Sequence, residues 1–131
     1  MAAITRTFTI GPAPDRLRRL HEAEVAGLEA ALDVPRPGNT AGDVASALYR
    51  TIEKMGLKKE SRCGYAIGID WPEPISLEVG NMTELKPNMT FHLMLGNWVE
   101  EEFGYVVSET CRLTDSRVEV LTKAPRKLFE L

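Results

Sequence analysis

Two side chains in the second half of the sequence could do acid–base chemistry. His92 lies in Met89–Leu95, where apolar and polar residues alternate, and Glu109 lies in the segment Val106–Thr110, which is predicted to be a strand. An imidazole with a pKa of about 6.5 exchanges protons at neutral pH, whereas a buried carboxylate needs a partner. His92 is therefore either a partly buried structural histidine or part of a cleft. Glu109 is either a salt-bridge partner at a sheet edge or part of a binding site.

Other catalytic signatures are missing from the sequence. The second histidine, His21, lies in a charged run and is expected on the solvated face of a helix. Neither histidine has a His or Cys neighbour at metal-site spacing. No phosphate-binding loop or Gly-x-Ser-x-Gly motif is present. Two cysteines, Cys63 and Cys111, are too few for a disulfide scaffold.

The composition limits the class of partner. The 131 residues include 16 Lys and Arg against 19 Asp and Glu, a net charge of −3. Neither nucleic acid nor a membrane surface is an expected partner, because both require a concentrated basic face. No apolar run reaches the roughly 18 residues of a membrane span, and the N-terminus lacks a signal peptide's apolar stretch. We expect one soluble, cytoplasmic domain.

The first half of the sequence predicts a strand followed by a helical hairpin. Ile4–Ile10 alternates β-branched or aromatic residues with polar ones, as a strand does. A helix is predicted from Asp15, because apolar residues recur there at helical spacing. Pro35–Asn39 ends it. A second helix starts at Thr40, with Asp43 placed to complete a capping box, and ends at Gly56.

The second half is predicted to be β-rich. Strands are expected in four segments, with turns at Trp71–Pro74, Leu85–Asn88 and Thr114–Ser116; the strand segments are Tyr65–Ile69, Met89–Leu95, Phe103–Leu113 and Arg117–Leu121. The fold class is therefore α+β, with the helical hairpin covering an antiparallel sheet.

Short motifs, in order along the whole chain, resemble those of the pita-bread family, which includes creatinase, Xaa-Pro aminopeptidase and prolidase. They are Ile4–Phe8, Arg36–Val44, Gly64–Gly68, Leu85–Phe91 and Ser108–Thr110. Phe91–Trp98 and Pro125–Phe129 look most like the ectoine hydrolase branch. The resemblance implies that residues 1–131 form half of a pita-bread fold, the C-terminal portion of its catalytic domain, with a curved antiparallel sheet. The first half and the family's N-terminal domain would be absent. A lone half would expose a sheet edge and apolar surface, so a homo-oligomer is expected.

The resemblance also implies where the peptidases' metal ligands would lie. Those enzymes hold two metal ions with two Asp, one His and two Glu. One Asp position precedes this sequence, and the other positions match Ala3, Tyr65, Met94 and Glu109, with a further peptidase histidine at Pro72. Only Glu109 is a ligand-type side chain, and one carboxylate cannot hold a divalent ion. No metal or other cofactor is expected.

The implied activity is that of a metal-independent C–N hydrolase that opens the cyclic amidine of an ectoine-like small molecule. His92 would be the general base, and Glu109 would face the amidinium. Tyr65, Glu73 and Trp98 would contact the substrate. The side chains of His92, Glu109 and Tyr65 are expected to converge on one concavity.

Two alternatives remain open. The chain is a relative of the Xaa-Pro metallopeptidases, or it is a non-enzymatic family member that acts through self-association. In each case the isolated chain is expected to be an inactive, partial domain.

Overall fold

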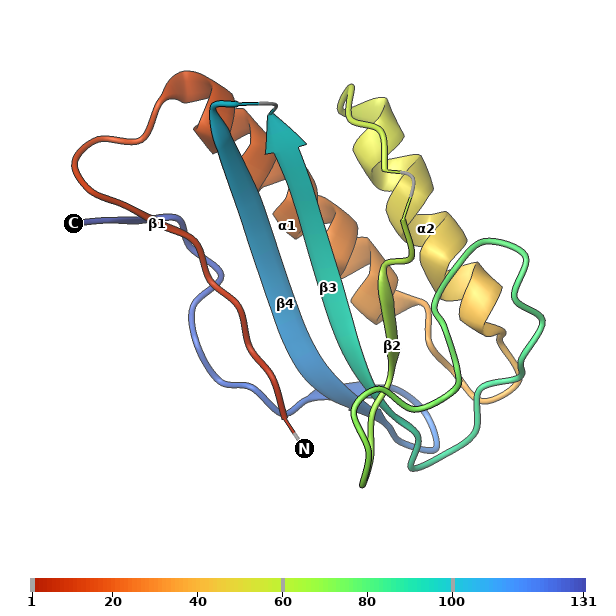
Figure 1. Ribbon diagram of the computed structural model, residues 1–131. Coiled ribbons are helices and arrows are strands. Elements are labelled where there is room, and N and C mark those ends of the chain that lie inside the picture. The colour runs from red at the N-terminus through yellow and green to blue at the C-terminus, as the bar shows by residue number, and fades with distance from the viewer. Residues whose placement is uncertain (1, 60, 100) are drawn as a thin grey trace.

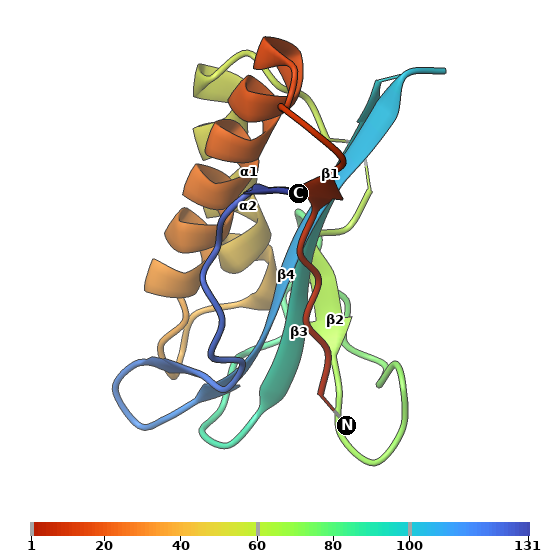
Figure 2. The same ribbon diagram turned by 90° about the vertical axis from the view of Figure 1, so that its left-hand side faces the viewer.

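Two helices cover one face of a four-stranded sheet in the computed structural model, which describes residues 2–59, 61–99 and 101–131 (Figures 1 and 2). The helices are α1 (Asp15–Asp33) and α2 (Ala41–Lys54). The sheet has the order β2-β3-β4-β5, with antiparallel neighbours; its strands are β2 (Gly64–Ala66), β3 (Thr90–Val99), β4 (Phe103–Leu113) and β5 (Val118–Val120). The predicted α+β class is confirmed.

The start of α2 is fixed by its own sequence. The Thr40 side chain accepts a hydrogen bond from the Asp43 amide at 3.2 Å, and the Asp43 carboxylate accepts one from the Thr40 amide at 2.8 Å. Two amides that the helix leaves unpaired are thus satisfied. The predicted capping box is confirmed.

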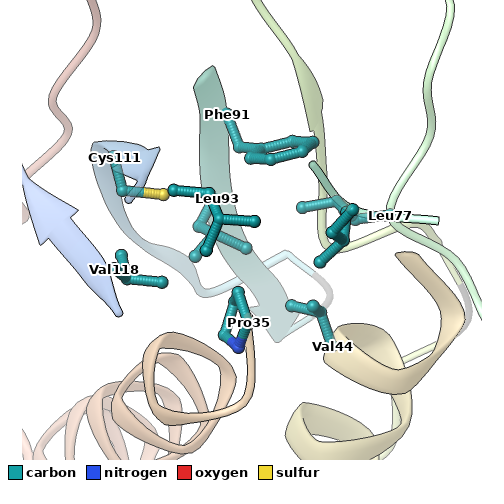
Figure 3. Close-up of a pocket in the computed structure, with 9 residues that line it drawn as sticks. Pro35, Val44, Leu77, Phe91, Leu93, Cys111 and Val118 are labelled. Atoms are coloured by element: carbon teal, nitrogen blue, oxygen red, sulfur yellow. The ribbon is translucent and has the colours of Figure 1, made fainter. Parts of the chain in front are cut away.

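The two faces of the sheet have different surroundings. Alternate residues of β3 and β4 point toward the helices and build the core, among them Phe91, Leu93, Leu95, Val107, Cys111 and Leu113. Figure 3 shows Phe91, Leu93 and Cys111 around an apolar pocket that Pro35 and Val44 close from the helical layer. We call this side the helix face. The other side, the distal face, has no helix over it (Figure 2).

The two ends of the chain lie side by side. β1 (Phe8–Thr9) pairs in parallel with β6 (Phe129–Glu130). The predicted strand Ile4–Ile10 is therefore only partly observed. Thr5 makes a single bridge to Ser108 of β4, and the segment then turns away to pair with the C-terminal residues. Strand β6 was not predicted, because its partner is distant in the sequence.

No helix among the described residues is both long enough and apolar enough to cross a membrane.

Helix α1 buries ionisable groups against the sheet. The Nδ1 atom of His21 lies 2.6 Å from the Tyr105 hydroxyl, so His21, predicted to be solvated, is half-buried and bonded to the sheet. Glu24, one turn further on, is fully buried, and neither carboxylate oxygen has a hydrogen-bond partner among the described residues. Burial raises the pKa of Glu24 to about 7, against the opposing effect of the Lys59 ammonium.

Glu24 should make stability fall as pH rises. Because its folded-state pKa is raised, the folded protein retains a proton that the unfolded chain releases, so the free energy of unfolding drops between about pH 4.5 and 7. Over this pH range the free energy of unfolding of the wild type should fall by about 3 kcal/mol more than that of Glu24→Gln. Urea unfolding at several pH values measures the difference. The exposed control Glu22→Gln should follow the wild type, and parallel curves for Glu24→Gln and wild type would contradict the assignment.

Candidate functional site

His92 lies in a cluster of three rings on the distal face. Its Nδ1 atom is 3.0 Å from the Tyr65 hydroxyl, and its ring centroid lies 5.2 Å from that of Trp71 and 5.3 Å from that of Tyr65. The side chain is 3% exposed. Burial lowers the pKa of His92, so the imidazole is neutral at neutral pH. Its Nε2 atom has no hydrogen-bond partner among the described residues.

Strand β2 positions Tyr65 beside His92. The two residues are direct cross-strand partners. The close approach depends on Gly64, because a Cβ there would lie 2.3 Å from the His92 carbonyl oxygen. The Arg62 guanidinium lies 4.7 Å from the centroid of the Tyr65 ring, which brings a cation next to the cluster.

Glu109 does not converge with His92 and Tyr65, contrary to the expectation from the sequence. Its cross-strand partner is Leu93, whereas the partner of His92 is Thr110. Since cross-strand partners share a face and side chains alternate along a strand, Glu109 belongs to the helix face and His92 to the distal face.

The Glu109 carboxylate is instead the centre of an ion-pair network. It lies 2.5 Å from the Arg6 guanidinium and 2.9 Å from Nε of Arg126, and it accepts a hydrogen bond from the Thr122 hydroxyl. The carboxylate is 1% exposed. We call these four side chains the Glu109 network. Of the two interpretations of Glu109 from the sequence, the structure supports the salt bridge.

Arg6 extends this network to the backbone of three segments. Besides Glu109, its guanidinium donates to four carbonyl oxygens at 2.7–2.9 Å, those of Thr5, Ser108, Ala124 and Pro125. The N-terminal segment, β4 and the C-terminal segment are thus held together. The sequence reasoning did not identify Arg6 or Arg126, because neither lies near Glu109 in the chain.

The residue of β4 that shares the distal face with Met94 is Ser108, its direct cross-strand partner. Ser108 therefore fits the second glutamate position of the peptidases better than Glu109 does. Ala3 also lies at this face, since its amide donates to the Thr110 hydroxyl at 2.8 Å. No carboxylate or imidazole occurs among the four matched positions, which are Ala3, Tyr65, Met94 and Ser108.

This donor set does not fit a divalent metal ion. Hard ions and zinc require carboxylate, carbonyl, imidazole or thiolate ligands in number. The described residues contain no group of three or more His, Cys, Asp and Glu side chains that could hold one.

The two remaining predicted residues are Glu73 and Trp98. Glu73 is in the same turn as Trp71, and its carboxylate accepts a hydrogen bond from the Asp70 amide at 3.2 Å. Trp98 is on the distal face, but six residues along β3, about 20 Å from His92. Its indole lies over Gly96 and Gly104 and is 75% exposed. Trp98 is therefore not part of the ring cluster.

Comparison with known proteins identifies the family. The sequence profile of metallopeptidase family M24 matches residues 1–115. The chain belongs to this family. It is 67% identical over 129 residues to an uncharacterized hydrolase/peptidase, y4tL, of Sinorhizobium fredii, and 40% identical over 134 residues to the ectoine hydrolase of Halomonas elongata. Each match covers 98% of this chain but 33% of the relative, so the chain spans about a third of their length.

Solved structures agree with this assignment. A dipeptidase from Pyrococcus horikoshii matches 99% of this chain and 37% of its own with a TM-score of 0.94 at 30% identity. The predicted relation to the pita-bread family is confirmed.

The Glu109 network should carry a large share of the stability. Glu109→Gln removes the charge and leaves two arginines partly buried, which typically costs about 3 kcal/mol or more. Urea unfolding should show this loss. The exposed pair Arg112–Glu119 provides the control, since Glu119→Gln should change the free energy of unfolding by less than about 1 kcal/mol. Equal losses in the two variants would contradict a special role for Glu109.

Proposed function

We propose that this chain is the C-terminal portion of a metal-independent hydrolase that opens the cyclic amidine of ectoine or a close analogue. The main support is the His92 site, where a buried neutral imidazole lies among positions that offer no metal ligands. The 40% identity to an ectoine hydrolase over nearly the whole chain supports the substrate class.

In this proposal His92 is the general base. If its Nδ1–H donates to the Tyr65 oxygen, the Nε2 atom accepts a proton from the attacking water. The water oxygen bonds to the amidinium carbon, the ring C–N bond breaks, and both water protons end on the leaving nitrogen, which departs as an ammonium group. The product is an N-acylated diamino acid.

Neighbouring groups would hold the substrate. The exposed ring of Trp71, held by the edge of Tyr65, suits a delocalised cation, and Arg62, over the Tyr65 ring, suits the substrate carboxylate. Glu73 is the nearest of the predicted carboxylates to this cluster along the chain, in the same turn as Trp71. The exposed indole of Trp98 would act at the far end of the same face.

We expect low activity from the isolated chain. Glu109, the carboxylate predicted to face the amidinium, points to the helix face and is already neutralised by Arg6 and Arg126. The second candidate, an Xaa-Pro peptidase, is favoured by the M24 profile and by the dipeptidase structure, but it requires metal ligands that the matched positions lack.

A chimeric enzyme can distinguish ectoine opening from Xaa-Pro peptide hydrolysis. This chain would replace the matching third of the Halomonas elongata ectoine hydrolase, and the purified chimera would be incubated with ectoine, or with an Xaa-Pro dipeptide and Mn²⁺. We expect ectoine opening without added metal, measured by NMR of the product. His92→Ala should reduce kcat by about a hundredfold or more, whereas His21→Ala should have a small effect.

Dipeptide hydrolysis that depends on Mn²⁺ would favour the peptidase. A chimera that folds but acts on neither substrate would favour the non-enzymatic alternative.

We also propose that the isolated chain self-associates. Large apolar side chains are exposed at several places, including Trp98, Phe8 and Ile10. Light scattering coupled to size exclusion should show a dimer or larger species. Trp98→Glu should shift it toward the monomer. A wild-type monomer at high concentration would contradict this.

A further inference from the structure

Two polar atoms on the distal face are buried without a hydrogen-bond partner among the described residues. They are the Nε2 atom of His92 and the Oγ atom of Ser108, in side chains that are 3% and 0% exposed. An unsatisfied buried polar group costs about 1–3 kcal/mol, and native proteins usually satisfy such groups through a bound water or a ligand.

The two residues are close neighbours on one face. His92 pairs with Thr110, and Met94 pairs with Ser108, so His92 and Ser108 are diagonal neighbours across β3 and β4. Diagonal neighbours lie about 7–8 Å apart, within reach of a long or aromatic side chain. Since the imidazole ring can itself span much of that separation, one small polar group between the two side chains can reach both atoms.

The adjacent hydroxyls are already used. The Thr110 hydroxyl accepts from the Ala3 amide and donates to the Ala3 carbonyl, both at 2.8 Å. The Tyr65 hydroxyl bonds Nδ1 of His92. The Ser108 hydroxyl and the Nε2 edge of His92 are the fully buried polar groups of this face that have no partner among the described residues.

We propose that Ser108 Oγ and His92 Nε2 together bind one water, and that this is the nucleophilic water of the proposed hydrolysis. The catalytic part of this inference rests on the proposed function. Ser108 is a positioning residue, because its hydroxyl orients the water while His92 takes the proton. The arrangement is a base oriented on one side by Tyr65 and bonded on the other to the nucleophile, as in other activated hydrolytic sites.

A high-resolution crystal structure of the full chain tests the water site. We expect one ordered water within hydrogen-bond distance of both Ser108 Oγ and His92 Nε2. In Ser108→Ala that water should be lost or displaced, whereas Ser116→Ala, in the exposed turn between β4 and β5, should retain it. A direct hydrogen bond between the two side chains, or no water between them, would overturn the proposal.

Kinetics of the chimera test the role of that water. Ser108→Ala should lower kcat about tenfold, equivalent to one hydrogen bond, with KM and the pH profile unchanged. Ser116→Ala should have no effect. An ordered water with an unchanged kcat in Ser108→Ala would overturn the catalytic role and identify the water as structural.

The two proposals fail in different ways. If the chimera does not open ectoine but the crystal structure shows the water on both atoms, the proposed substrate is wrong and the water site stands. If ectoine is opened and no such water is found, the hydrolase stands and the Ser108–His92 site is wrong.

Discussion

The buried carboxylate of Glu109 constrains the rest of this structure. A carboxylate at 1% exposure is tolerated only with good partners, and Glu109 has two guanidinium groups and a hydroxyl. Arg6 comes from the segment before α1, and Arg126 comes from the segment after β5. Satisfying one charge therefore fixes both end segments against β4, which in turn places Ala3 and Thr5 at the rim of the distal face.

The side chains of strand β4 alternate between the core and the face that carries the proposed site. Val107, Glu109 and Cys111 face the helices and hold the core and the ion pairs. Ser108 and Thr110 face the other way, toward His92. A shift of one residue in the register would exchange the two sets. The long β3–β4 pairing and the salt bridges of Glu109 thus maintain the geometry of the proposed His92 site, to which Glu109 itself does not belong.

Local signals predicted much of this arrangement. The periodicity of α1, the capping box at Thr40 and the alternation around His92 depend on residues close together in the sequence, and each was recognised. The same alternation could have shown that Glu109 lies on the helix face. Val107, Cys111 and Leu113, which alternate along β4 in step with Glu109, are all apolar. Matching a short motif by similarity instead selected Glu109 in place of Ser108. The partners Arg6 and Arg126 lie beyond any local pattern, so only the folded structure reveals them.

The distant pairing of the chain ends has a consequence for how the protein folds. Glu109 is 103 residues from Arg6 and 17 from Arg126, and β1 pairs with β6 across nearly the whole sequence. Contacts of such long range form slowly. The helical hairpin and the β3–β4 pair, whose contacts are closer in the sequence, can assemble before the two end segments meet at Glu109, while one edge of β4 is incompletely covered. In that interval the folding chain is most exposed to pairing with another molecule.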